Sequence, residues 1–187
     1  MGYKIDIVIF INKQKYRVMS TCPIPCNESA RLEDLKSLNI LDTATDLRFE
    51  LIVSFLVREI NIPMALVTLI DANRQWFKAS LGVKASEISR EISVCAYAIC
   101  EITSKKPEDR LYEIADLKND LRFFENPLVV EEPHCRSYIS YVLQSASGNN
   151  IGTLCLVDVQ PRVFNSEEKN LLVNVGKMAN ELIIGRT

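Results

Sequence analysis

The sequence predicts an α+β fold organised around one antiparallel sheet, and two apolar runs are the main reason. Residues 64–71 and 151–159 are rich in β-branched and other apolar side chains, and Pro161 closely follows the second run. Each run is typical of one strand, and neither of its two alternating faces suits water. We therefore expect the two strands to be neighbours at the middle of a sheet that carries helices on at least one face.

Hydrophobic periodicity and capping residues predict the helices. Four stretches with helical spacing of apolar residues each follow a Ser, Thr or Asp that can cap them. They lie at 31–38 after Ser29, at 46–59 after Thr45 or Asp46, at 94–102 after Ser93, and in the final segment after Ser166. The final helix has two apolar stripes, Leu171–Val175–Met178–Leu182 and Leu172–Ala179–Ile183. These stripes form either one broad buried face or a buried face beside a dimer seam.

Further strands are predicted at 74–81, 110–114 and 135–145. Hairpins are expected to join 64–71 to 74–81 and 135–145 to 151–159, the second through the Ser147-Gly148-Asn149-Asn150 turn. We interpret 82–91 as a loop and 116–128 as short helical turns. The result is a sheet of about five or six strands, with the terminal helices on one face and the middle helices over the other.

Charge and composition narrow the function classes. The net charge is −2 and no basic stripe occurs, so a nucleic acid is not an expected partner. No apolar run approaches the roughly 20 residues of a membrane-spanning helix, and Asp6 interrupts the apolar N-terminal stretch where a signal peptide would need continuity. Six cysteines without an export signal indicate reduced thiols, and hence a cytoplasmic location.

Residues 1–27 differ from the rest of the chain. They contain four basic residues and one acid, so they carry +3 and residues 28–187 carry −5. We predict an N-terminal extension at 1–27, with a possible hairpin and a linker containing Pro23 and Pro25, followed by one domain at 28–187.

Several motifs, in order along the acidic portion, resemble those of one family. They are Arg31-Leu32 with Ile40-Leu41-Asp42-Thr43, Arg74-Gln75-Trp76-Phe77-Lys78-Ala79, Arg90-Glu91 with Ser93 and Cys95-Ala96, Asn126-Pro127-Leu128-Val129, Arg136 with Tyr138, and Gly152-Thr153-Leu154-Cys155 with Asp158. This part of the chain resembles a GAF domain of the type at the N-terminus of bacterial sensor histidine kinases and diguanylate cyclases. The resemblance implies a GAF-like sheet with a pocket between it and the middle helices. Tyr97 departs from the pattern, because this subgroup usually has His there.

A pocket of this kind would be lined by polar groups that interrupt apolar strands. Thr68 and Thr153 are such groups, and each either points into the cavity or bonds its own backbone. Trp76 is either pocket wall or ordinary core. Cys95 is expected near the pocket, and Tyr138 is expected to stack on a ligand or donate a hydrogen bond.

Arg136 has two open interpretations. It either meets an anionic group of the ligand or pairs with Asp116 or Asp120 and pins the irregular segment. We expect no metal site, because the only histidine, His134, does not form a recognised zinc-ligand spacing with Cys22, Cys26 and Cys135. The ligand and any cofactor are not identified by the sequence.

The sequence thus favours a regulatory module that senses a small molecule, has no catalytic site of its own, and acts through dimerisation of its terminal helices or on a signalling partner in trans. Two alternatives stay open. One is a cysteine-dependent enzyme resembling free methionine sulfoxide reductases, which are small GAF proteins, with Cys95, Cys100 and Cys135 near the presumed pocket. The other is a degenerate GAF domain that serves only as a dimerisation scaffold.

Overall fold

The computed structural model describes residues 22–185, and the predicted N-terminal hairpin lies outside these residues. One six-stranded antiparallel sheet organises the described part, in the strand order β3-β2-β1-β6-β5-β4. The strands are β1 Met64–Ile70, β2 Arg74–Leu81, β3 Glu87–Ser89, β4 Leu111–Ile114, β5 Ser137–Gln144 and β6 Asn150–Asp158. The predicted α+β class, the two hairpins and the central β1–β6 pair are confirmed.

The prediction of a loop at 82–91 is wrong at its centre. Residues Glu87–Ser89 form β3, which pairs with the start of β2 and closes one edge of the sheet. Three residues are too few to show an alternating pattern, so periodicity could not reveal this strand.

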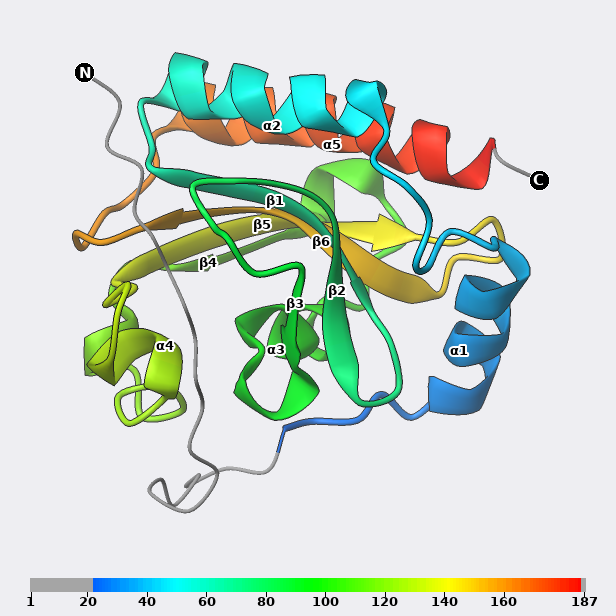
Figure 1. The fold of residues 1–187 in the computed structure, drawn as a ribbon, viewed down its shortest axis with the longest axis horizontal. Helices are drawn as coiled ribbons and strands as arrows, with labels where there is room; N and C mark the ends of the chain where they lie inside the picture. Colours follow the sequence, from blue (N-terminus) through cyan, green and yellow to red (C-terminus); the bar gives the residue numbers. More distant parts are fainter. Residues whose placement is uncertain (1–21, 186–187) are drawn as a thin grey trace.

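The helices cover the two faces of the sheet unequally. They are α1 Glu28–Ser37, α2 Leu47–Ile60, α3 Val94–Glu101, α4 Pro127–Val130 and α5 Ser166–Ile184, with short 3₁₀ turns η1 Arg90–Ile92, η2 Pro107–Asp109 and η3 Leu117–Asn119. Figure 1 shows α2 and α5 side by side over one face, α3 and α4 on the other, and α1 to one side. The predicted division between terminal and middle helices therefore holds for α2, α5, α3 and α4.

Capping residues fix where the helices begin. Asp46 and Ser93 cap α2 and α3 as expected, each accepting a hydrogen bond from a backbone N–H of the first turn. Asn165, and not Ser166, caps α5. Its side chain accepts hydrogen bonds from the backbone N–H groups of Glu167 and Glu168, and the Glu168 carboxylate accepts one from the Asn165 backbone N–H. This reciprocal pair satisfies more unpaired N–H groups than a serine cap one residue later would. At α1 the capping position belongs to Asn27 and not to Ser29.

Two apolar clusters sandwich the sheet. Alternate residues of β1, such as Val67 and Leu69, pack under α2 and α5, whereas Leu66 and Ile70 pack toward α3. On α5 the residues Leu172, Val175, Ala179 and Ile183 are buried against the sheet, whereas Met178 remains 58% exposed. Gly176 allows this close packing, because a Cβ there would lie 2.4 Å from ring atoms of Tyr141 on β5.

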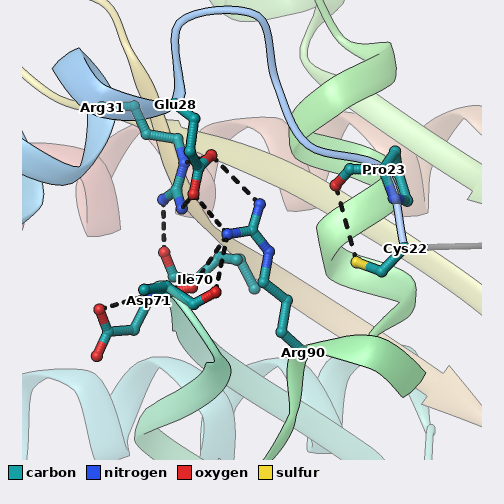
Figure 2. A network of polar contacts seen from close by, with 8 residues as sticks. Cys22, Pro23, Glu28, Arg31, Ile70, Asp71 and Arg90 are labelled. Atoms are coloured by element: carbon teal, nitrogen blue, oxygen red, sulfur yellow. Dashed lines mark hydrogen bonds and ion pairs between the residues drawn. The ribbon is translucent and has the colours of Figure 1, made fainter.

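A network of two arginines and one glutamate holds α1 to the rest of the domain (Figure 2). Arg31 is completely buried, binds both carboxylate oxygens of Glu28, and donates to the backbone carbonyl of Ile70 at the end of β1. Arg90 of η1 reaches the same carboxylate and the carbonyls of Asp71 and Ala72. Partial burial opposes ionisation of Glu28, but the hydrogen bonds from Arg31 and Arg90 outweigh it and lower the pKa of Glu28 to about 2. The network therefore ties the first helix to the β1–β2 turn.

Within residues 22–185, no helix has both the length and the hydropathy that a bilayer crossing requires.

Candidate functional site

A cavity of about 70 Å³ lies between the sheet and its irregular cover. Its floor includes Leu66 of β1 with Cys155 and Val157 of β6, and its cover includes Cys95 of α3 and Leu128 of α4. This volume exceeds the roughly 10–15 Å³ that one water molecule needs, and it is far below the roughly 300–1,000 Å³ of drug-sized pockets. In this conformation the cavity therefore accommodates a group of a few non-hydrogen atoms.

Polar groups converge on the sulfur of Cys95, one of the residues that line this cavity. The hydroxyl of Tyr138 on β5 donates to Cys95 Sγ at 3.1 Å, and the amide Nε2 of Gln75 on β2 donates to it at 3.2 Å. The Sγ of Cys155 lies 3.8 Å away. Ser93 holds the other end of the Gln75 amide and also caps α3, so one serine orients both the helix and the amide.

Thr68 and Thr153 lie directly opposite each other on the two central strands. Both are fully buried, and their hydroxyl oxygens are 3.2 Å apart. Neither threonine is among the residues that line the cavity, but hydrogen bonds from both hydroxyls help to lower the pKa of Cys95. The structure therefore does not bring Thr68 and Thr153, which the sequence proposed as ligand-binding residues, into the cavity lining.

Ionisation of the cavity thiols differs strongly from one cysteine to the next. Desolvation of Cys95 opposes its ionisation, but hydrogen bonds from Cys155 and from the surrounding hydroxyls outweigh desolvation and lower the pKa of Cys95. The hydrogen bond between Cys155 and Cys95, together with desolvation, raises the pKa of Cys155. Desolvation raises the pKa of Cys135, another lining residue, to about 12. Cys95 is therefore the thiol of this cavity that most readily becomes a thiolate.

Two predicted site residues lie elsewhere. Trp76 belongs to the cluster under α2 and α5, on the opposite face of the sheet from the cavity, so the pocket-wall interpretation is corrected to core. Arg136 pairs with an aspartate instead of facing a ligand. Its guanidinium donates two hydrogen bonds of 2.8 Å to the Asp116 carboxylate, and Arg136 is not among the residues that line the cavity. That pair holds η3 against the start of β5, since Leu117 also donates its backbone N–H to the Arg136 carbonyl.

Sequence reasoning missed Gln75, Ser93 and Cys155 as members of the site. Cys155 shares the alternating face of Thr153, so the strand pattern contained a signal for it. Gln75 gave no such signal, because a glutamine near the start of an outer strand is ordinarily solvent-exposed. Within residues 22–185, no cluster of three or more His, Cys, Asp or Glu residues is arranged to hold a metal ion.

Comparison with known proteins agrees with this architecture. A GAF domain family model matches residues 40–183. A cyclic di-GMP phosphodiesterase of Pseudomonas aeruginosa (strain PAO1) is 37% identical over 144 residues, which are 77% of this chain and 23% of that protein. The chain therefore spans about a quarter of the length of this curated relative.

Solved structures of low sequence identity share the fold. The GAF domain of an Acinetobacter phosphoenolpyruvate-protein phosphotransferase superposes with a TM-score of 0.58 at 15% identity, covering 82% of this chain and 92% of that one. A type II free methionine-R-sulfoxide reductase from Thermoplasma acidophilum gives a TM-score of 0.56 at 14% identity, covering 73% and 89%. The family model matches more than half of the chain, so the chain belongs to the GAF domain family.

Proposed function

We propose that this GAF domain is a regulatory signalling module that binds a small molecule in the cavity between the sheet and α3. The observation that carries the proposal is the cavity itself: a mostly apolar space whose lining includes Cys95 with its two hydrogen-bond donors, Tyr138 and Gln75. Apolar walls with a few placed polar groups are the usual composition of small-molecule sites.

The dimensions of the cavity restrict the ligand. About 70 Å³ is roughly half of an engineered 150 Å³ apolar cavity that binds benzene. No charged side chain is among the lining residues, so an ionic ligand would lose its hydration without compensation. We therefore expect an uncharged ligand of a few non-hydrogen atoms, with one group that hydrogen-bonds to Tyr138 or Gln75. A nucleotide is far too large for this conformation.

The outer surface of the paired helices supports an output by dimerisation. Leu47, Leu51 and Phe55 recur every four residues on α2, and they are 67%, 60% and 37% exposed. Met178 adds an exposed apolar side chain on the neighbouring α5. Apolar residues at this spacing on adjacent helices favour association with another helical surface. We propose a homodimer through α2 and α5, with regulation of a signalling partner as the alternative output. Free thiols along the described chain suit a cytoplasmic setting.

Ligand sensing is tested by native mass spectrometry of the purified chain, followed by the same measurement on Leu128→Trp. Leu128 is a partly buried cover residue of the cavity, so a tryptophan there fills the space without altering the sheet. We expect a co-purified small molecule in the wild type and its loss in Leu128→Trp. Leu121→Trp is the matched control, because Leu121 is 82% exposed and outside the cavity. An empty wild-type chain that also binds nothing from a library of small uncharged compounds would refute the sensing proposal.

Dimerisation is tested separately by sedimentation velocity. Leu51→Glu places a charge at the centre of the α2 stripe and should shift a dimer to monomer, whereas Glu50→Lys, an exposed change on the same helix outside the stripe, should not. A ligand-free chain that remains an obligate dimer would favour the scaffold alternative over sensing.

The enzyme alternative has less support. Free methionine sulfoxide is a zwitterion, and no charged side chain lines this cavity to receive its amino and carboxylate groups. We accordingly propose that the chain has no reductase activity. Incubation with free methionine sulfoxide and a dithiol reductant tests this, and turnover above the Cys95→Ser background would overturn it.

A further inference from the structure

Two of the buried cysteines are close enough to react with each other. Cys95 is the second residue of α3 and Cys155 lies in the middle of β6, so one belongs to the cover of the cavity and the other to its floor. Their sulfurs are 3.8 Å apart, and their residues are 3% and 1% exposed. A disulfide needs about 2.05 Å between sulfurs, so an approach of roughly 1.8 Å would join them.

The surroundings of Cys95 differ from those of an inert core thiol. Its sulfur accepts hydrogen bonds from the Tyr138 hydroxyl and the Gln75 amide, and both donors stabilise negative charge on sulfur. Cys95 also lies in the first turn of α3, where the helix dipole favours an anion. These contacts agree with the lowered pKa of Cys95, and Cys155 keeps its proton because its own pKa is raised. The arrangement separates an attacking thiol from a resolving thiol.

We propose that Cys95 and Cys155 form a redox-active pair, which a hydroperoxide that enters the cavity converts into an intramolecular disulfide. The cavity volume of about 70 Å³ selects the oxidant class. Hydrogen peroxide, with one oxygen atom more than water, fits into this space, whereas a glutathione-sized disulfide does not. This inference shares the cavity with the ligand proposed above but does not depend on that ligand.

The reaction balances with the hydroperoxide as sole oxidant. The Cys95 thiolate attacks one peroxide oxygen, the O–O bond breaks, and the leaving oxygen takes up the proton that Cys95 released, departing as an alcohol or as water. Cys95 then carries a sulfenic acid. The Cys155 sulfur attacks the Cys95 sulfur, the S–O bond breaks, and the hydroxyl leaves with the Cys155 proton as water. Two thiols lose two electrons, and the hydroperoxide gains them.

The disulfide would also change the site. Closing the gap between the sulfurs draws the first turn of α3 toward β6 and removes Cys95 as the acceptor for Tyr138 and Gln75. The cover and the floor would then be covalently joined across the cavity. A covalently closed cavity binds its ligand differently, so oxidation would act on the same signalling output.

The reduced chain provides a direct test. It is exposed to a small molar excess of hydrogen peroxide, alkylated in denaturant, digested, and analysed by mass spectrometry. We expect Cys95 and Cys155 to lose reactivity together, with a linked peptide lighter by two hydrogen atoms. Their oxidation should be at least about tenfold faster than that of Cys135, which lines the same cavity with a raised pKa.

Two variants assign the roles. Cys155→Ser should stop the reaction at a sulfenic acid on Cys95 that dimedone traps. Cys100→Ser, the matched control at a partly buried thiol outside the cavity lining, should form the disulfide as the wild type does. If Cys95 and Cys155 both stay reduced and are alkylated while the exposed Cys26 is oxidised, the proposal is overturned. This outcome is read from the wild type alone, so it does not require the variants to fold. A ligand that still co-purifies in that case leaves the sensing proposal standing.

Discussion

Replacing Glu28 by glutamine should destabilise the domain by about 2 kcal/mol at neutral pH. The pKa of Glu28 lies at about 2 instead of its ordinary 4.5, which at 1.36 kcal/mol per pKa unit corresponds to about 3 kcal/mol of stabilisation in the ionised state. We reduce this figure because the side chain is 19% exposed and solvent screens part of the interaction. Glutamine keeps the shape of the side chain but leaves the completely buried Arg31 without a counter-charge.

The pH dependence separates this mechanism from a simple loss of packing. A carboxylate with a lowered pKa stabilises the folded state fully above its unfolded pKa of about 4.5, and the contribution is lost as the pH falls toward about 2. Urea unfolding at pH 7 should therefore show the full difference in the free energy of unfolding between wild type and Glu28→Gln, and this difference should shrink at pH 3. In thermal unfolding at pH 7, the melting temperature of the variant should be lower by about 4–8 °C. Glu33→Gln, an exposed change on the same helix, is the control. A difference that is equal at both pH values would refute the electrostatic reasoning.

Further predictions concern the sheet and the helices. Gly176→Ala should cost about 1–3 kcal/mol in urea unfolding, since the new methyl group meets the Tyr141 ring at 2.4 Å, whereas Met178→Ala, at an exposed position, should change little. Thr68→Val should cost about 1–3 kcal/mol because it removes the hydrogen bond between the two buried hydroxyls. Thr68→Val with Thr153→Val should cost less than the two single changes together, and additive losses would contradict the pairing. Thr153→Val should also slow alkylation of Cys95 at pH 7 by a maleimide reagent, because it removes a hydrogen bond that favours the thiolate; an unchanged rate would assign no role to Thr153.

Much of the sheet could be predicted from local pattern. The runs at 64–71 and 151–159 are apolar on both faces, and the structure indeed places β1 and β6 side by side at the centre. Turn residues such as Gly148 located the hairpin between β5 and β6. Asp46 and Ser93 marked the first turns of two helices, because a capping side chain acts on backbone groups only two or three residues away. All of these signals are local in sequence.

The candidate site depended on contacts that local pattern does not contain. Cys95 and Cys155 are separated by 60 residues, and their proximity requires the packing of a helix on a strand from another part of the chain. Arg136 presented two chemically reasonable partners, and only the position of η3 decides that Asp116 is the one it binds. Trp76 was ambiguous for a similar reason: the register shift in the β1–β2 pair at Val67 and Thr68 lies beside it, and assigning its face needs the strands in place.

The positions of β1 and β6 at the centre of the sheet also bear on how a signal would leave the domain. Only residues 61–63 separate the end of α2 from β1, and residues 159–165 join β6 to α5. The two strands that carry Leu66 and Cys155 are thus bonded, through short covalent connections, to the two helices on the far face. We therefore expect a displacement of these strands to change the spacing or tilt of α2 relative to α5. In this way, a small shift of β1 or β6 at the cavity would alter the exposed surface that α2 and α5 form on the opposite face of the sheet.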